Sequence, residues 1–315
     1  MKKRFNMNKC DMFLNSFMMT IERGDAYKHG KKKKVYYPEN VKRDVIEDGA
    51  VRKVVRFTSD IGKSKLVHYA IGYPDFYRID FQTYLNLKDK NAHLQFAFRK
   101  PENCKITSEV PYGSIERKEG YVPVINWLNM SNEIESVCII NSGLPEYEIT
   151  DNFVFLGLIR GFGKLSGLRK PLSLPLRTPK AQELGEHVFR YSIISHADDI
   201  NLTNEGMKFN IPLITDILDV QDGDLSREES FIRVLSDGFT LKAVKKAENN
   251  NDLIIRIVNT SDKGSNCTVC VNKHINKVYE TDLLEKSIKE LEHLFVSFTF
   301  YSKPFEIKTF RISFY

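Results

Sequence analysis

The stretch from Val122 to Gly163 constrains the fold most strongly, because it combines strand and turn signals in one continuous run. Trp127, the only tryptophan, lies on a short apolar segment, and a second apolar segment follows at 137–140. Asn141-Ser142-Gly143 then predicts a turn, since asparagine and glycine tolerate positive φ at little cost. The stretch therefore predicts neighbouring strands of a β-sheet core.

Strand signals continue on both sides of this stretch. Tyr147 and Ile149 alternate with polar residues, as in a half-buried strand, and 153–159 is an apolar run suited to burial on both faces. Alternating or β-branched segments predict further strands at 51–58, 65–73, 78–87, 94–98, 187–194, 231–235, 239–244, 253–258, 267–271, 296–301 and 306–314. Short polar links between many of them indicate antiparallel hairpins.

Three segments do not have a clear strand pattern. Leucines and an isoleucine in 282–294 are spaced for one face of a helix, although a strand at 279–284 fits equally well. The segment 202–226 is ambiguous, and we interpret it as strand, loop and inter-domain connection. Three prolines between Gly161 and Lys180 predict a long loop, and loops on a rigid β scaffold are common binding sites.

Length and composition indicate a soluble globular protein with more than one domain. A chain of 315 residues exceeds one average domain. We predict an N-terminal remnant segment (1–30), a large domain (31–226) and a small C-terminal domain (227–315). Hydrophobic residues make up 42% and charged residues 28%, and the mean hydropathy is −0.35. No run approaches the ~20 apolar residues that span a bilayer, so we expect no membrane partner.

Cysteine and lysine content bear on location and partners. The five cysteines are an odd number, and several lie in strand-like runs, which favours a reducing, cytoplasmic setting. The net charge of +6 and the run Lys31-Lys32-Lys33-Lys34 invite a nucleic-acid interpretation. Because no nucleic-acid-binding motif surrounds that run, we predict a solvated loop and no nucleic-acid partner.

Several segments together resemble one known family. GLPEYEI (143–149), LIRGFGKLSG (158–167) and ELGEHVFRYSIISHADD (183–199) resemble the C-terminal β region of glycoside hydrolase family 38, the retaining α-mannosidases and mannosylglycerate hydrolases. The resemblance extends to RIDFQTYLNLKDKNAHLQFAF (78–98), PYGSIER (111–117), residues 230–262, LLEKSIKEL (283–291) and PFEIKTFRI (304–312). These segments follow the family's order from about Ile21 to the end.

The resemblance implies a mainly β fold, a galactose mutarotase-like β super-sandwich followed by a smaller C-terminal β-sandwich domain. In the family, an N-terminal α/β barrel carries the zinc site and the catalytic aspartates, and a helical bundle follows it. We expect both to be absent here, which makes the chain a half-enzyme whose catalytic half is on another polypeptide, or a truncated gene product. The zinc ion is expected in that half, so no cofactor, metal ligand or catalytic residue is assigned to this chain.

The resemblance also implies two substrate-binding residues. In some relatives the β region supplies a tyrosine and an arginine to the sugar pocket. Tyr27 of RGDAY matches the family segment that holds the tyrosine, and Arg160 of LIRG corresponds to the arginine. The alternatives are an ordinary loop tyrosine and a strand-end arginine that pairs with a carboxylate.

Other constellations have ordinary structural interpretations. His196, Asp198 and Asp199 form either a small metal cluster or a β-turn. Cys267 and Cys270 have zinc-like spacing but lack a second ligand pair, and on a strand their thiols point to opposite faces. Asp80 with Glu116, or Glu146 with Glu148, are candidate carboxylate pairs for glycoside hydrolysis, although we expect Glu146 and Glu148 to face solvent.

Three functional hypotheses follow. The first is a non-catalytic β-sandwich half that binds an α-mannoside and completes the pocket of a catalytic-barrel subunit, and is inactive alone. The second is an inert carbohydrate-binding or assembly remnant. The third is an aldose epimerase-like enzyme, which needs a histidine and a glutamate facing one cleft, with His68, His93 or His187 as the histidine.

Overall fold

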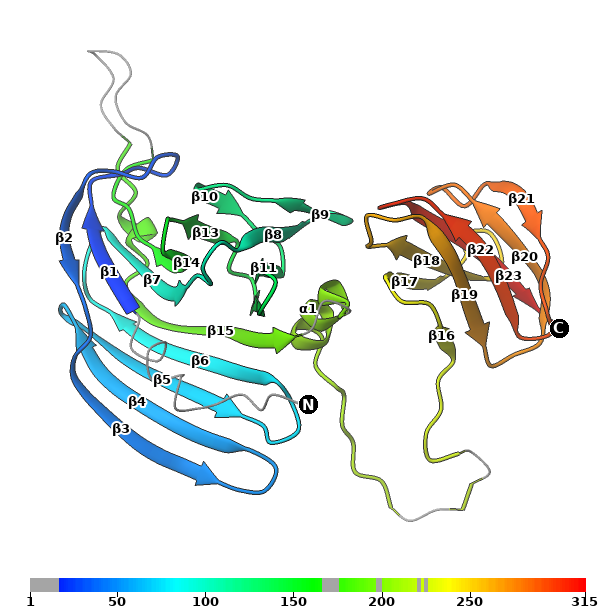
Figure 1. Cartoon of the computed structure of the whole chain (residues 1–315), viewed down its shortest axis with the longest axis horizontal. Coiled ribbons are helices and arrows are strands. Elements are labelled where there is room, and N and C mark those ends of the chain that lie inside the picture. The colour runs from blue at the N-terminus through cyan, green and yellow to red at the C-terminus, as the bar shows by residue number, and fades with distance from the viewer. Residues whose placement is uncertain (1–16, 166–175, 197–199, 220–221, 224–225) are drawn as a thin grey trace. The chain divides into compact units, whose positions relative to one another are not determined.

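The computed structural model describes residues 17–165, 176–196, 200–219, 222–223 and 226–315. This described part is almost entirely antiparallel β-structure (Figure 1). It forms two compact units, the larger comprising the chain up to Ser108 together with Ile115–Ile200, and the smaller Glu109–Ser114 with Asn201–Tyr315. The mainly β class and the order of a large and then a smaller β domain are therefore confirmed.

The larger unit contains two sheets. The six-stranded sheet has the order β10-β13-β14-β7-β1-β2. Its strands are β1 (Phe17–Glu22), β2 (Lys32–Tyr36), β7 (Ala92–Arg99), β10 (Gly120–Pro123), β13 (Glu146–Ile149) and β14 (Phe153–Arg160). The nine-stranded sheet has the order β3-β4-β5-β6-β15-β12-β11-β8-β9. Its strands are β3 (Glu39–Asp48), β4 (Lys53–Ile61), β5 (Ser64–Gly72), β6 (Arg78–Leu87), β8 (Lys105–Val110), β9 (Gly113–Glu116), β11 (Trp127–Ser131), β12 (Ser136–Asn141) and β15 (Gly185–His196).

The two sheets of the larger unit pack face to face around one apolar core. Phe96 of β7 and Tyr147 of β13 come from the six-stranded sheet, whereas Phe81 of β6 and Tyr191 of β15 come from the nine-stranded sheet. All four side chains are buried, and the ring centroids of Phe96 and Tyr191 lie 5.2 Å apart. Because alternate residues of each strand point inward, the remaining residues form an outer face on each sheet.

The smaller unit is a second β-sandwich with its own core. A three-stranded sheet has the order β16-β19-β22, and a five-stranded sheet has the order β17-β18-β23-β20-β21. The strands are β16 (Ile232–Val234), β17 (Phe239–Lys246), β18 (Leu253–Asn259), β19 (Ser265–Val271), β20 (Ile275–Thr281), β21 (Ser287–Leu291), β22 (Ser297–Ser302) and β23 (Ile307–Phe314). Phe298 and Phe300 of β22 pack against Phe310 of β23, which joins the two sheets.

The predicted strands of both units are confirmed. Of the two interpretations left open for the segment that follows, the helix at 282–294 is wrong, and the strand at 279–284 is confirmed in part, since β20 extends to Thr281. A hairpin replaces the helix, in which β21 pairs with β20. Asp282 accepts hydrogen bonds from the backbone N–H groups of Leu284 and Lys286, and Glu285 has a φ of +65°. That turn ends any helix before it can begin, and the helical spacing of the leucines was coincidental.

Three further expectations differ from the structure. Residues Lys32–Tyr36 form the edge strand β2 rather than a loop, although Lys32 to Lys34 are solvent-exposed as expected. Lysines on an edge strand discourage pairing with other chains. The units divide between Ile200 and Asn201, whereas the sequence placed the change at 226/227. Residues Phe17–Glu22, predicted to lie in a separate N-terminal segment, form β1 inside the six-stranded sheet.

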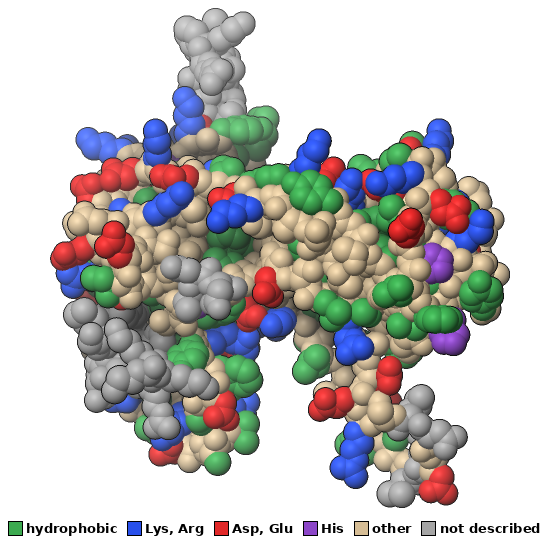
Figure 2. All heavy atoms as spheres, turned by 45° about the vertical axis from the view of Figure 1, so that its right-hand side comes forward, with side chains coloured by type: hydrophobic (Ala, Val, Ile, Leu, Met, Phe, Trp, Pro, Cys, Tyr) green, Lys and Arg blue, Asp and Glu red, His purple; other side chains and the backbone are tan. Residues whose placement is uncertain are grey.

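The helices are few and short. The 3-10 helix η2 (Pro179–Gln182) lies within the predicted long loop, and α1 (Leu202–Asn210) begins the second unit's main segment. Among the described residues no helix has the length and apolar character needed to cross a membrane. On the face shown in Figure 2, Lys and Arg side chains are interspersed with Asp and Glu side chains.

Candidate functional site

The outer face of the six-stranded sheet carries an unusual set of polar side chains. Antiparallel pairing places directly opposite residues on the same face. Thr20 pairs with His93 and His93 with Arg160, so these three share one face, opposite to the inward-pointing Leu94. Glu148, which pairs with Tyr121, lies on this outer face as well. Strand alternation therefore gathers charged and aromatic side chains from five neighbouring strands.

Tyr27 lies on the loop 23–31, which joins β1 to β2 beside this face. The carboxylate of Asp25 accepts hydrogen bonds of 2.9 Å from the backbone N–H groups of both Tyr27 and Lys28. Ala26 N–H donates to the carbonyl oxygen of Leu165, a residue of the predicted long loop, at 3.3 Å. The loop backbone is thus fixed, while the side chain of Tyr27 itself is 76% exposed.

Arg160, at the end of β14, forms hydrogen bonds to the same loop and to Glu22 at its start. Its Nε donates to Glu22 Oε1 at 2.5 Å, and its Nη2 donates to the carbonyl oxygen of Lys28 at 2.8 Å. The structure therefore brings the two predicted site residues together in one loop assembly, with Tyr27 pointing outward and Arg160 supporting the loop. This is also the carboxylate pairing foreseen as the alternative for Arg160.

Gly24 makes that support possible. A Cβ atom at this position would collide with Arg160 Nη2 and with the carbonyl oxygen of Lys28. Only a residue without a side chain lets the guanidinium reach the loop backbone. The backbone conformation of the RGDAY segment is therefore stabilised by Arg160 as well as by the turn at Asp25.

Four ionisable side chains form a cluster next to this loop. His29 Nδ1 lies 3.6 Å from Glu22 Oε2, and His29 Nε2 lies 3.2 Å from Glu146 Oε2. His93 Nε2 lies 2.8 Å from Glu146 Oε1. The side chains of Glu22 and His93 are almost fully buried, with 2% and 1% exposed, whereas those of His29 and Glu146 are partly accessible. We call these four residues the His–Glu cluster.

The charges of the cluster support one another. Burial alone lowers the pKa of His29, but the carboxylates of Glu146 and Glu22 outweigh it and raise the pKa to about 9. Burial alone raises the pKa of Glu146, but His29 and His93 outweigh it and hold the pKa well below its usual range. The pKa of Glu22 is likewise lowered against burial, by His29 and Arg160. His29 and the two carboxylates therefore favour one another's charged forms.

The expectation that Glu146 and Glu148 face solvent is wrong. They do share one face of β13, but Glu146 belongs to the His–Glu cluster, and Glu148 accepts a hydrogen bond from Gln95 Nε2 at 2.9 Å. Tyr121 of β10 stacks on the ring of His29, with centroids 3.8 Å apart. Burial, and next the charge of Glu148, raise the pKa of Tyr121 far above its usual value. A strand face toward solvent was predicted because sequence alternation does not reveal what covers an outer face.

The remaining candidate constellations do not assemble into sites. Asp80 pairs with Arg78 and Glu116 with Lys105, so each carboxylate has a basic partner of its own. Cys267 is buried among apolar side chains and burial raises the pKa of its thiol to about 12, while Cys270 alternates to the other face of β19. His196 contacts Asn129 Oδ1 at 2.9 Å, and the neighbouring Asp198 and Asp199 lie outside the described residues.

The three histidines considered for an epimerase are held by contacts with other residues of the chain. His68 is enclosed by aromatic rings and burial lowers its pKa to about 3. His93 does contact a glutamate, Glu146, but only 1% of its side chain is exposed, so it cannot reach a sugar directly. His187 contacts the carbonyl oxygen of Glu183 and stacks on Phe189.

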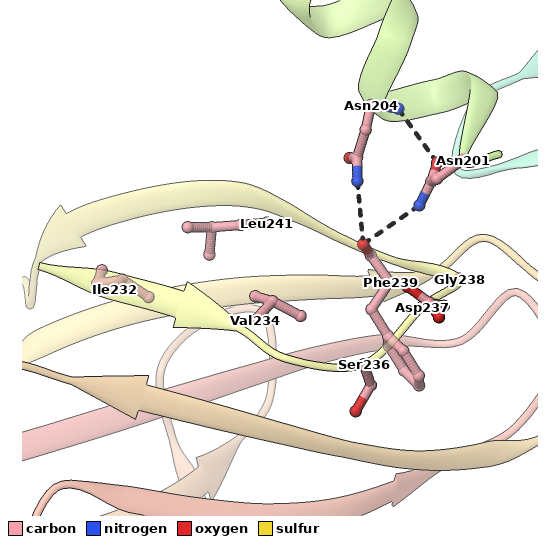
Figure 3. A pocket seen from close by; sticks show the side chains of 9 residues that line it. All are labelled: Asn201, Asn204, Ile232, Val234, Ser236, Asp237, Gly238, Phe239 and Leu241. Atoms are coloured by element: carbon pink, nitrogen blue, oxygen red, sulfur yellow. Dashed lines mark hydrogen bonds between the residues drawn. The ribbon is translucent and has the colours of Figure 1, made fainter. Parts of the chain in front are cut away.

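A pocket of about 310 Å³ lies in the smaller unit, between α1 and the strands β16 and β17 (Figure 3). Its amides are used to attach α1, because Asn201 and Asn204 both donate to the carbonyl oxygen of Phe239, at 3.3 and 3.5 Å. Ser236 Oγ accepts a hydrogen bond from the backbone of Thr268. The two amides therefore attach α1 to β17, and the serine bonds the backbone of β19.

The sequence did not reveal the His–Glu cluster. Glu22, His29, His93 and Glu146 are spread over four segments and form no spacing motif. Only the register of β1, β7 and β13 brings them together. The usable signal was the placement of His93 at an outward position of a strand that is otherwise buried.

Comparisons with known proteins agree with this architecture. The family model described as the glycosyl hydrolases family 38 C-terminal domain matches residues 3–164, and that of the family 38 C-terminal beta sandwich domain matches residues 238–310. A putative mannosylglycerate hydrolase of Halalkalibacterium halodurans is 24% identical over 169 residues, which cover 52% of this chain and 18% of that protein.

Two solved structures from Enterococcus faecalis share the fold. One is described as an alpha-mannosidase and the other as a protein in glycosyl hydrolase family 38. Each has a TM-score of 0.80 at 18% sequence identity and covers 95% of this chain. The chain spans only 38% and 40%, respectively, of the length of those two proteins.

Proposed function

Because the chain belongs to glycoside hydrolase family 38, we propose that it is the β-sandwich half of an α-mannosidase-like enzyme. In this proposal it binds carbohydrate and completes the sugar pocket of a catalytic barrel on another polypeptide. The barrel contributes the zinc ion and the nucleophile, and this chain contributes Tyr27. The chain alone is then inactive.

The observation that carries the proposal is the contrast between the exposed Tyr27 side chain and its fixed backbone. A hydroxyl group on a pre-positioned loop loses little conformational freedom when it binds a sugar hydroxyl. A hydrogen bond placed in this way strengthens as charge develops in the oxocarbenium-like transition state. Arg160 acts in this proposal as a positioning residue, through Glu22 and the Lys28 carbonyl.

An exposed apolar segment of the smaller unit supports a partner. Leu213, Ile214 and Ile217 are 93%, 100% and 97% exposed, and Leu218 is 71% exposed. Closely spaced apolar side chains in water favour association with another surface. The same observation favours the second candidate, an assembly module without catalysis, and the two candidates differ in whether the assembly hydrolyses a mannoside.

The deciding experiment measures hydrolysis of an aryl α-mannoside in the presence of zinc. The purified chain alone is compared with the chain mixed with the product of a neighbouring reading frame that encodes the barrel. Activity only in the mixture supports the pocket-completing role. No activity in either sample, with binding of mannose still measurable, supports the inert carbohydrate-binding module instead.

A Tyr27→Phe substitution tests the residue that the proposal depends on. Removing the hydroxyl should lower turnover of the assembled enzyme by more than tenfold, which corresponds to about 1.4 kcal/mol in the transition state. Tyr37→Phe is the matched control, because Tyr37 is also exposed, by 62%, on the same unit. Equal turnover of the Tyr27→Phe variant and the unmodified chain would remove Tyr27 from the pocket.

A further inference from the structure

We propose that Glu22, His29 and His93 form a binding site for a divalent transition-metal ion of the zinc class, with Glu146 orienting the two imidazoles. The site lies on the outer face of the six-stranded sheet. It does not rest on the sugar-pocket role, since binding of the ion can be measured on this chain alone.

The geometry brings three ligand atoms into range of one ion. One carboxylate oxygen of Glu22 and one nitrogen each of His29 and His93 all lie within 4.8 Å of one another. Around a tetrahedral zinc ion, ligand atoms stand about 3.3 Å apart. His29 Nδ1, on the β1–β2 loop, and Glu22 Oε2 lie 3.6 Å apart, which is close to that spacing. Arg160 Nε bonds Glu22 Oε1, so Oε2 is the ligating oxygen, and its long hydrogen bond of 3.3 Å from the backbone N–H of Gly30 leaves a lone pair for the ion.

Unsatisfied nitrogens point to a missing partner. His93 Nδ1 and Nε2 and His29 Nδ1 are buried and have no hydrogen-bond partner, although Glu146 Oε1 approaches His93 Nε2. Leaving a buried polar atom unsatisfied costs about 1–3 kcal/mol. His93 is among the most buried histidines of the described chain, so solvent does not supply the missing partner. A bound metal ion would satisfy an imidazole nitrogen of each histidine.

Glu146 occupies the position of an orienting carboxylate. His29 presents Nδ1 toward Glu22 and Nε2 toward Glu146 Oε2, at 3.2 Å. A metal-bound histidine commonly donates its other N–H to a carboxylate, which fixes the tautomer and the ring orientation. With Nδ1 on the ion, His29 has the arrangement that such a carboxylate–histidine–metal triad requires.

The donor set selects the class of ion. Two imidazoles with one carboxylate suit zinc and its transition-metal neighbours, whereas calcium and magnesium prefer oxygen ligands. The ion would connect the β1–β2 loop to β1 and β7. It would therefore fasten the loop that carries Tyr27 to the sheet.

The experiment titrates the chelator-treated full chain with zinc alone by calorimetry, and with cobalt(II) by visible absorption. We expect saturable binding of one ion per chain and cobalt d–d bands without thiolate charge transfer. His93→Gln and His29→Gln should each abolish binding. Glu146→Gln should weaken it by about 10- to 100-fold, as for other orienting carboxylates. His187→Gln is the matched control and should bind normally.

The variants also guard against a folding artefact. Because His93 is buried, its substitution can disturb folding as well as binding. His29→Gln, on the partly exposed loop, is therefore judged by the same titration once its circular dichroism spectrum matches that of the unmodified chain. The proposal is overturned by an absence of saturable binding, which leaves the cluster as an ion-pair network only. It is equally overturned if both histidine variants still bind, or if His196→Gln or Cys270→Ser removes binding instead.

Discussion

At the scale of single residues, Arg160 connects the buried part of the site to its exposed part. Its guanidinium bonds Glu22, which is 2% exposed, and also bonds the backbone of the loop that presents Tyr27. A planar guanidinium with several donors can make both bonds at once, whereas a lysine ammonium on a flexible stem cannot match that geometry. The arginine therefore acts on the loop from a position that a sugar does not need to reach.

Arg160→Ala should destabilise the larger unit by about 2 kcal/mol, because charge-assisted hydrogen bonds are lost and Glu22 stays buried. Chemical denaturation measures the change. Arg52→Ala is the control, since the Arg52–Glu47 pair is exposed, 50% and 38%, and such pairs contribute less than about 1 kcal/mol. Equal losses of unfolding free energy in both variants would show that Arg160 does not stabilise the loop.

At the scale of elements, α1 depends on an amide at its start. Asn201 is the N-cap of α1, and its side chain accepts a hydrogen bond from the backbone N–H of Asn204. Its Nδ2 donates to the carbonyl oxygen of Phe239, which attaches the helix to β17. The sequence NLTNE thus contained a helix-start signal, an asparagine followed by a short polar turn, that the strand-and-loop interpretation of 202–226 overlooked.

Asn201→Ala should lower the stability of the smaller unit by about 1 kcal/mol, the typical effect of removing an N-cap. Thermal and urea unfolding give the value. Lys208→Ala on the same helix serves as the reference, because its side chain is 68% exposed and its pair with Glu205 contributes only a few tenths of a kcal/mol. A loss for Asn201→Ala no larger than that of the reference would mean that α1 is held by packing alone.

At the scale of the whole molecule, the core of the larger unit contains a buried histidine that makes its stability sensitive to acid. The core of the larger unit encloses His68, whose Nδ1 contacts Thr83 Oγ1 at 2.9 Å among the rings of Phe17, Phe81 and Phe96. Burial lowers the pKa of His68 to about 3, below the value of about 6.5 in an unfolded chain. The native larger unit therefore keeps a neutral histidine where the unfolded chain takes up a proton.

The sign of the pH dependence follows from this difference. The stabilisation is fully present above pH 6.5 and is lost as the pH falls from about 6.5 to about 3, by up to about 1.4 kcal/mol per pH unit. Denaturation curves of His68→Phe, recorded at several pH values, should have a shallower acid slope. The Thr83 hydroxyl keeps its contact with Tyr191 Oη in that variant. His187→Phe should retain the slope, and an unchanged slope in His68→Phe would assign the acid sensitivity to other groups.

Sequence patterns were enough to predict most of the strands and the mainly β class, and the order of several segments indicated the family. Alternation in segments such as 78–87 and apolar runs such as 153–159 are local properties, and they appear as β6 and β14. Asp282, which forms a turn, is a local signal of the same kind. The helical spacing of the apolar residues in 282–294 pointed to a helix instead. The helix was predicted because side-chain spacing says nothing about the backbone turn between two strands.

Tertiary structure alone decided which outward-facing side chains meet. Glu22, His29, His93 and Glu146 come together because β7 pairs with β1 on one side and with β14 on the other, and β14 pairs with β13. Register across four strands is a non-local property, and no residue in any of these segments specifies it alone. Family resemblance predicted Tyr27 and Arg160 as substrate-binding residues. Their connection through a shared loop, and the His–Glu cluster beside them, exist only because the sheet brings distant segments to one face.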